Sequence, residues 1–337
     1  MADRQELIEA FLSREGWAEA HRTPLTGDAS FRRYHRLEEN GRQAMLMDAP
    51  PPQEDIGPFL DIARHLSGLG YSAPNILGDD REAGLILLED FGDSTFTRLL
   101  AAGADETALY ILATDVLIDL HQKPAAAAIP ANLPSYDFGK LLAETALLTD
   151  WFIPAATGQK LSISEAQEYQ ALWTAILSIP NSIPDTLVLR DYHVDNLMRL
   201  DDRAGIAACG LLDFQDAVAG PVTYDLVSLI EDARRDVSPV TAAAVKARYL
   251  AAFSDLDPYD FDRSMTVLGA QRHAKVIGIF TRLCVRDGKS IYLDHIPRVW
   301  RLLDAACEHP DLTPISEWLD KHIPADLRGV PEGLRAS

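Results

Sequence analysis

The chain has 337 residues, of which 47% are hydrophobic and 24% are charged. This length and composition are typical of a globular protein with a core large enough for two lobes. A formal net charge of −20 argues against nucleic acid or an anionic membrane as a partner, because both bind basic surfaces. The sequence has no run of about 18 apolar residues and no apolar signal segment, so we expect no membrane span and a cytoplasmic location.

The cysteines and histidines predict neither disulfides nor a zinc site. Cys209, Cys284 and Cys307 form no C-x-x-C pair, which favours free thiols in a reducing compartment. The histidines show no metal-ligand spacing. We therefore look for chemistry elsewhere in the chain.

The first 88 residues predict a small sheet with one or two helices. Apolar residues recur at helical spacing over 3–14 and 59–69. Residues 31–37 and 44–47 alternate as strands do, and 84–88 is a continuous apolar run typical of a buried strand. Residues 26–31 are typical of a tight turn. We predict a first lobe over residues 1–88 and a hinge at about 88–92.

Helical patterns dominate the remainder, which we predict to form a second lobe over residues 89–337. The exception is a pair of short strands between about 185 and 214. The longest helical pattern contains Gly269 and Gly278, and we expect a break at one of them. The predicted helices cover 94–102, 105–121, 137–151, 164–178, 223–235, 239–253, 259–286 and 296–307.

The two short strands carry the most informative residues of the chain. The first runs into Asp191-Tyr-His-Val-Asp-Asn196, and the second, Gly210-Leu-Leu-Asp213-Phe214, follows closely. An Asp, an Asn and a second Asp are thereby delivered to roughly one place. Phosphoryl transfer uses this set: one carboxylate orients and deprotonates the acceptor hydroxyl, while an Asn and an Asp hold magnesium ions that bridge the nucleotide phosphates.

The order of these features, with Ala219-Gly-Pro-Val-Thr-Tyr-Asp-Leu226 downstream, resembles the aminoglycoside phosphotransferase/choline kinase family of small-molecule kinases. The family pattern is H-G-D-x-x-x-x-N followed by I-D-W-E-x-A-x-x-G-D-P-x-x-D-L. The resemblance implies an α+β, protein-kinase-like, two-lobed fold with a small β-rich first lobe and a larger helical second lobe. It also implies ATP as co-substrate and Mg²⁺ as cofactor.

Carried over residue by residue, the resemblance makes Asp191 the catalytic carboxylate and Asn196 and Asp213 the magnesium ligands. Asp225 matches a later family Asp, which we interpret as structural: it would cap the helix that starts near Leu226 and brace the catalytic loop.

The resemblance also predicts nucleotide contacts. Leu88-Glu89-Asp90-Phe91 resembles the connector whose backbone hydrogen-bonds the adenine ring, so Glu89 and Phe91 are assigned to nucleotide binding. The strand that supplies a phosphate-binding Lys in the family reads Ala44-Met-Leu-Met-Asp48, without Lys. Arg32 and Arg33 are the nearest cations and could replace it, because Arg binds phosphate bidentately.

Another departure precedes the catalytic Asp, where the family's His-Gly is Leu189-Arg190. This Arg could steady the loop or contact phosphate.

Several segments resemble one subgroup, the anomeric kinases that phosphorylate N-acetylmuramate and N-acetylglucosamine in bacterial cell-wall recycling. The segments are Thr26–Tyr34, Met47–Pro51, Leu189–Met198 and Gln271–Phe280. The resemblance implies transfer of the γ-phosphate of ATP to the C1 hydroxyl of an amino sugar.

A cationic stripe fits such a substrate. Basic residues fall at helical spacing over 272–286, and this face could receive the lactyl carboxylate of N-acetylmuramate. Such a stripe is also typical of a surface or of internal ion pairs. Tyr192 and His193 could contact the sugar ring, and Asp216 could be a further ligand. The predicted sugar-binding residues are Tyr192, His193, Asp216, Arg272 and Arg282, with Lys275 and Arg286 in the same stripe.

Three other interpretations stay open. A kinase of another small alcohol, such as an aminoglycoside, choline or homoserine, would share the motif. A non-catalytic nucleotide-binding regulator would explain Met45 and Met47 where Lys is expected. A metal-dependent phosphohydrolase could use clustered Asp residues, but it would not need the connector at 88–91.

Overall fold

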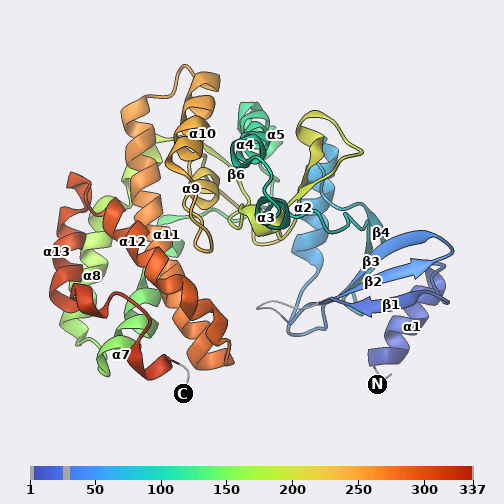
Figure 1. Ribbon diagram of the computed structural model, residues 1–337, viewed down its shortest axis with the longest axis horizontal. Helices are drawn as coiled ribbons and strands as arrows, with labels where there is room; N and C mark the ends of the chain where they lie inside the picture. The colour runs from blue at the N-terminus through green and yellow to red at the C-terminus, as the bar shows by residue number, and fades with distance from the viewer. Residues whose placement is uncertain (1–3, 26–30, 336–337) are drawn as a thin grey trace. The chain divides into compact units, whose positions relative to one another are not determined.

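The computed structural model describes residues 4–25 and 31–335, which pack into two compact units (Figure 1). Unit 1 consists of the chain up to Val116 together with Asp191–Ala217, and unit 2 consists of Leu117–Arg190 together with Val218 onward. The lobe boundary at 88–92 stays a prediction. The turn predicted at 26–31 lies almost entirely outside the described residues.

Unit 1 contains a five-stranded antiparallel sheet in the order β1-β2-β3-β5-β4. Asn40 and Gly41, with φ of 52° and 76°, form the tight turn between β2 and β3, since positive φ at both central positions suits a hairpin. The strands predicted at 31–37, 44–47 and 84–88 are confirmed. Their bounds are β1 (His21–Pro24), β2 (Arg33–Glu39), β3 (Arg42–Asp48), β4 (Ile76–Asp80) and β5 (Leu85–Leu88).

The two faces of this sheet have different surroundings. Helix α1 (Arg4–Arg14) packs on one face, where its apolar residues meet Leu37, Ala44, Leu46, Leu85 and Leu87 (Figure 1). Side chains alternate between faces along a strand, so Tyr34, Arg36 and Met45 point away from α1 and line a pocket. The sheet is therefore an apolar platform on one side and a pocket wall on the other.

The acidic motif belongs to the same unit. Two short strands, β7 (Leu197–Arg199) and β8 (Cys209–Leu211), pair antiparallel and carry it. Isolated bridges join Ser72 to Gly210 and Thr95 to Met198, which attaches the motif to the rest of unit 1. The unit also holds α2 (Gly57–Gly68), α3 (Phe96–Ala101) and the beginning of α4 (Glu106–Gln122).

Unit 2 is mainly helical and has a large aromatic core that includes Phe152, Trp173 and Trp300. The predicted helices are confirmed in position, although α9 ends earlier than expected and the 137–151 pattern passes through a π-helical turn at Leu148–Phe152. The elements are α5 (Ala125–Ala128), α6 (Phe138–Leu147), α7 (Ile153–Thr157), α8 (Ile163–Ile176), β6 (Asp185–Val188), β9 (Val218–Pro221), α9 (Tyr224–Ile230), α10 (Pro239–Ala252), α11 (Pro258–Asp287), α12 (Ile296–Ala306) and α13 (Thr313–His322).

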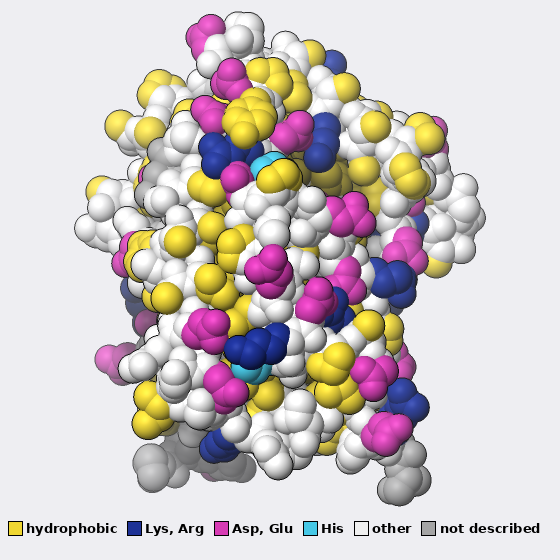
Figure 2. Space-filling view, turned by 90° about the vertical axis from the view of Figure 1, so that its left-hand side faces the viewer, with side chains coloured by type: hydrophobic (Ala, Val, Ile, Leu, Met, Phe, Trp, Pro, Cys, Tyr) yellow, Lys and Arg dark blue, Asp and Glu magenta, His cyan; other side chains and the backbone are white. Residues whose placement is uncertain are grey.

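Acidic and basic side chains are interspersed on the molecular face drawn in Figure 2, where Lys and Arg stand singly or in small groups among Asp and Glu. This distribution is typical of a surface with many local ion pairs. Over residues 4–25 and 31–335, no helix combines the length and the apolar character needed to cross a membrane. The described cysteines are free thiols, as predicted.

The predicted break in the longest helix is wrong, because α11 is continuous from Pro258 to Asp287. Its glycines permit close packing instead. A Cβ on Gly278 would lie 2.2 Å from the carbonyl carbon of Leu147, a backbone atom. A Cβ on Gly269 would lie 2.8 Å from Oε2 of Glu231, the end of a flexible side chain that also bonds His273 at 2.7 Å.

The two glycines of α11 give a matched test of this packing. We expect Gly278→Ala to lower the free energy of unfolding by about 1–3 kcal/mol, because the backbone of Leu147 must shift. Gly269→Ala should cost at most about 1 kcal/mol, since alanine favours the helix and offsets the loss of the Glu231–His273 bond when the carboxylate turns. Urea unfolding of both variants measures the difference. Equal stability of the two variants would contradict the close contact at Leu147.

Candidate active site

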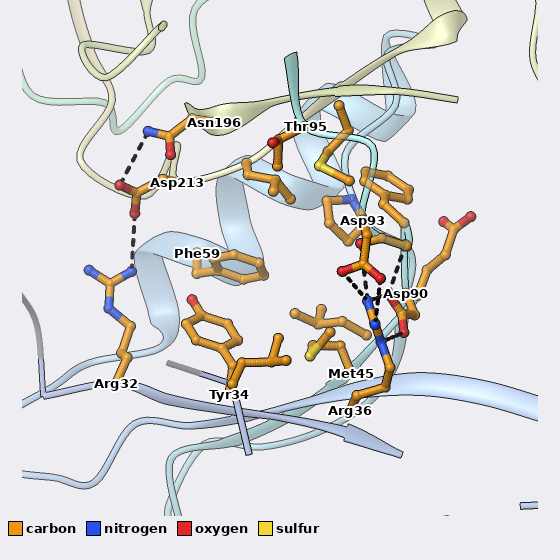
Figure 3. Close-up of a pocket in the computed structure, with 18 of the residues that line it drawn as sticks. Arg32, Tyr34, Arg36, Met45, Phe59, Asp90, Asp93, Thr95, Asn196 and Asp213 are labelled. Carbon is orange, nitrogen blue, oxygen red and sulfur yellow. Dashed lines mark hydrogen bonds and ion pairs between the residues drawn. The ribbon is translucent and has the colours of Figure 1, made fainter. Parts of the chain in front are cut away.

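A pocket of about 640 Å³ lies within unit 1. One wall is the sheet face that carries Tyr34, Arg36 and Met45, and the opposite wall contains Asn196 and Asp213 (Figure 3). The connector after β5 closes one end. The lining residues are Leu25, Arg32, Tyr34, Arg36, Met45, Phe59, Pro74, Leu88–Asp93, Thr95, Arg98, Asn196, Met198, Leu212, Asp213, Gln215 and Asp216.

The Asp191 loop is held by its own Asn. The Nδ2 of Asn196 donates to the backbone oxygen of Asp191 at 2.9 Å and lies 3.4 Å from Oδ2 of Asp213. The backbone nitrogen of Leu212 donates to the backbone oxygen of Asn196 at 2.9 Å. These bonds join the predicted Asp–Asn loop to the strand that carries the second Asp, so the structure brings the three residues together.

The backbone of Asp213 has a conformation that residues other than glycine rarely adopt. Its φ is 57°, a left-handed value that costs energy and is concentrated at functional sites. Neighbours fix it: Gln215 Nε2 donates to its Oδ1 at 2.8 Å, and Phe214 stacks on Phe59 with ring centroids 5.0 Å apart. The contacts of the two residues that follow Asp213 therefore support its strained backbone.

The pKa of Asp213 is raised above its ordinary value. Desolvation raises this pKa, the Asp191 and Asp216 carboxylates raise it further, and Arg32 lowers it. Burial and these like charges thus both favour the protonated form of the carboxyl. An excess of negative charge at this spot is what a bound divalent cation relieves.

Asn196 and Asp213 fit a magnesium ion in donor chemistry. Amide and carboxylate oxygens are hard ligands, and Mg²⁺ at a nucleotide site uses one or two protein ligands plus phosphates and water. In the part of the chain that the structure describes, no group of three or more His, Cys, Asp or Glu residues is placed to hold a metal. A magnesium ion shared with phosphates does not need such a group.

The two arginines proposed to replace the missing Lys have different surroundings. Arg32 lines the pocket, lies 3.7 Å from Asp213 Oδ1 and 3.3 Å from Glu54, and is 13% exposed. Arg33 is exposed on β2 and is not among the lining residues. Met45 lines the pocket where a Lys was sought. Arg32 is therefore the better placed of the two.

Glu89 and Phe91 both line the pocket, on the connector that follows β5. The Glu89 carboxylate pairs with Arg203 and accepts from Asn75 Nδ2 at 2.8 Å. Arg203 also stacks over the Phe91 ring, 5.1 Å from its centroid. The Glu89 carboxylate thus binds other residues of the protein, so the backbone of the connector is the part that can bind a ligand.

Sequence reasoning missed Arg36. It lies in the pocket and bonds Asp90 and Asp93 (Figure 3). The strand pattern gave only a weak signal. Residues 34 and 36 share a face, but a charged residue on the face opposite a core is ordinary for an antiparallel sheet.

In unit 2, Asp225 braces the residues that precede Asp191 in the chain, as predicted. Its buried carboxylate accepts from the backbone nitrogens of Leu189 at 2.7 Å and Arg190 at 2.9 Å. The predicted helix cap is wrong, because the N-cap residue of α9 is Thr223 and Asp225 lies inside the first turn. Arg190 has a φ of 69°, which explains why the family has Gly at this position.

The predicted sugar-binding residues have diverse surroundings. Asp216 lines the pocket. Tyr192 and His193 are buried, and the Tyr192 hydroxyl donates to the backbone oxygen of Ala113 at 2.8 Å.

The stripe on α11 is divided. Arg272 is buried and donates to Ser228 Oγ at 2.9 Å, and Lys275 pairs with Glu144 at 3.1 Å. Arg282 is half-buried, and burial together with nearby Arg286 lowers its pKa. These contacts give Arg272 and Lys275 internal partners. A role in sugar binding stays a prediction.

A β-sheet wall faces Asn196 and Asp213 across the pocket, and this arrangement is that of a protein-kinase-like phosphotransferase. Solved structures share this fold. One is a choline/ethanolamine kinase family protein from Mesorhizobium loti, with a TM-score of 0.63 and 13% identity over 95% of this chain and 100% of that one. Another is the GDP complex of aminoglycoside 2'-phosphotransferase-IIIa, with a TM-score of 0.61 and 16% identity over 90% of this chain and 98% of that one. The predicted fold class is confirmed.

Residues 21–261 match the model of the phosphotransferase enzyme family APH, and the chain belongs to that family. Two relatives named N-acetylmuramate/N-acetylglucosamine kinase are similar along nearly the whole chain. The protein from Caulobacter vibrioides is 35% identical over 97% of this chain and 99% of its own length. The one from Pseudomonas aeruginosa is 39% identical over 98% and 95%.

Proposed function

We propose that this protein transfers the γ-phosphate of ATP to the anomeric hydroxyl of N-acetylmuramate or N-acetylglucosamine. The similarity to relatives of that name, over nearly the full length of both chains, carries the proposal. The pocket in unit 1 supports it, because Asn196 and Asp213 line the pocket and Asn196 bonds the backbone oxygen of Asp191. We further propose a cytoplasmic location and the lobes 1–88 and 89–337.

In this proposal Asp191 orients the acceptor hydroxyl and takes its proton late, because the transition state of phosphoryl transfer is loose and needs little base strength. The anomeric hydroxyl of a sugar is more acidic than an ordinary alcohol, which suits a carboxylate. Asn196 and Asp213 would hold magnesium. The ion supplies charge neutralisation to the phosphates when bound.

The nucleotide would lie along the pocket. Its base would contact the connector near Glu89 and Phe91, and its phosphates would reach the end where Arg32 and Asp213 lie. Arg32 would act as the phosphate-binding cation, since a guanidinium binds phosphate bidentately. The sequence also proposes further contacts with the nucleotide or the sugar. These candidates are Arg33, Tyr192, His193, Asp216, Arg272 and Arg282.

Turnover on a substrate panel tests the proposed function. ADP release with ATP and magnesium should occur with N-acetylmuramate or N-acetylglucosamine and should stop when EDTA removes the metal. Kanamycin, choline and homoserine should not support it. Turnover only on one of these cationic or zwitterionic acceptors would reject the amino-sugar assignment. ATP binding without turnover on any acceptor would favour a regulatory protein.

A further inference from the structure

We propose that Arg36 is a positioning residue for nucleotide binding, which fixes the connector Glu89–Asp93 at the base end of the pocket. This inference rests on the proposed function, because it takes the pocket as the nucleotide site. It assigns a role to a residue that lies outside the Asp–Asn–Asp motif.

The contacts of Arg36 converge on one short segment. Its Nε and Nη2 bond the two oxygens of Asp90 at 2.5 and 3.1 Å. Its Nη1 bonds Asp93 at 3.0 Å, and Nη2 also donates to the backbone oxygen of Gly92 at 3.1 Å. Two carboxylates and a backbone carbonyl within four residues are thus held by one guanidinium (Figure 3).

Burial makes the Arg36–Asp90 pair strong. The side chain of Asp90 is 3% exposed and that of Arg36 is 18% exposed. A bidentate pair with this geometry gives both energy and a fixed orientation. Removing the arginine would leave the Asp90 carboxylate buried without its main counter-charge, which is costly. The connector would have to rearrange to hydrate it.

The connector has a second anchor on another element. Arg203, from the segment between β7 and β8, pairs with Glu89 and covers Phe91. Arg36 reaches the later residues of the segment from β2, and Arg203 reaches the earlier ones. Both anchors bond side chains of the connector, so its backbone is presented in one conformation. A pre-formed backbone lowers the entropic cost of ligand binding, because the connector does not have to become ordered when the ligand binds.

Charge acts in the same direction. The pocket is lined by the acidic residues Glu89, Asp90, Asp93, Asp213 and Asp216, and a nucleotide is itself an anion. Arg36 neutralises Asp90 at the connector end, beside Arg98 at Asp93 and Arg203 at Glu89. Without it, the pocket would repel the nucleotide as well as lose its shape.

The position of Arg36 gives the inference a specific signature. Figure 3 shows Arg32 beside Asp213 and Arg36 beside Asp90 and Asp93, at opposite ends of the pocket. If the base lies at the connector, Arg36 affects the affinity for every ligand that contains the base. Arg32 affects only ligands that contain phosphates.

Titration calorimetry with ADP and with adenosine tests this signature. We expect Arg36→Met to weaken adenosine by about tenfold, a loss of about 1.4 kcal/mol, and to weaken ADP at least as much, because a positive charge is also lost. KM for ATP should rise while kcat changes less than about twofold. Arg32→Met should weaken ADP and leave adenosine unchanged. Arg64→Met is the control, because Arg64 pairs with Asp79 at 2.8 Å outside the pocket and is 51% exposed; its affinities should match the wild type.

Thermal unfolding of each variant shows whether it is folded. If Arg36→Met is not, Arg36→Lys keeps the charge without the bidentate geometry, and we expect it to weaken both ligands by about threefold. A folded Arg36 variant with unchanged affinity for both ligands would overturn the inference, and so would a loss confined to ADP. Nucleotide binding by the wild type without sugar turnover would reject the proposed function and leave the role of Arg36 intact.

Discussion

Replacing Asp191 by asparagine should lower kcat by about two to four orders of magnitude and leave ATP binding nearly unchanged. The loss corresponds to about 3–5 kcal/mol of transition-state stabilisation. Asparagine keeps the shape of the side chain but cannot accept the proton of the acceptor hydroxyl. The backbone oxygen of Asp191, which accepts from Asn196, is not altered by the change, so the loop should keep its fold. Steady-state ADP release and calorimetry with ATP measure the two quantities.

A second aspartate in the same loop provides a matched control. Asp195 accepts a hydrogen bond from Thr97 Oγ1, and an asparagine at this position can still accept that bond. We expect Asp195→Asn to keep kcat within about threefold of the wild type. Near-normal turnover by Asp191→Asn would remove Asp191 from the catalytic role. An equal loss in both variants would indicate damage to the loop rather than to the chemistry.

The Asp–Asn–Asp motif was predictable because its geometry is local. Asp191 and Asn196 are separated by one short loop, and Asp213 follows on the next strand, so chain connectivity alone brings them close. The buried strands were predictable for a similar reason, since an apolar run such as 84–88 needs a core on both sides. The edge strands β1 and β4 were missed because exposed edges are polar, with β1 reading His-Arg-Thr-Pro and β4 ending in Gly-Asp-Asp.

Residues whose role depends on distant pairing could not be predicted. Arg36 meets Asp90 across 54 positions of the chain, and no periodic pattern encodes that contact. The sequence predicts a break at Gly269 or Gly278 because Gly disfavours helices, whereas Gly278 admits the backbone of Leu147 within a continuous helix. The stripe on α11 was visible as a pattern, but the partners that receive Arg272 and Lys275 lie on other helices.

A buried charge cluster in unit 2 surrounds Glu144, the partner of Lys275. Glu144 on α6 pairs with Arg190 at 2.6 Å and with Lys275 at 3.1 Å, and it accepts bonds from Tyr136 and Gln271. The three charged side chains are only 11–15% exposed. Burial alone would raise the pKa of Glu144, but Lys275 and Arg190 lower it below the ordinary value.

This cluster also holds a strained backbone position. Arg190 has a φ of 69°, which is unfavourable for a residue with a side chain. Its backbone nitrogen is bound by Asp225, its backbone oxygen by Ser228, and its guanidinium by Glu144. Such a conformation persists only where surrounding contacts determine it. Glu144 is therefore expected to stabilise unit 2 in two ways: it pairs with the buried cations Arg190 and Lys275, and it holds the strained backbone at Arg190.

Replacing Glu144 by alanine should lower the free energy of unfolding by about 3–5 kcal/mol at pH 7, because two largely buried cations lose their counter-charge. Urea unfolding measures the loss. Glu168→Ala is the control: Glu168 is 51% exposed and 3.8 Å from Lys321, and an exposed pair of this kind contributes at most about 1 kcal/mol. The same variant tests the pH dependence of the cluster. Because the folded pKa of Glu144 is depressed, its contribution is fully present above the unfolded pKa of about 4.3 and is lost as pH falls through the folded pKa.

The stability difference between wild type and Glu144→Ala should thus shrink in acid. A difference below about 1 kcal/mol at pH 7 would show that the cluster adds little to stability.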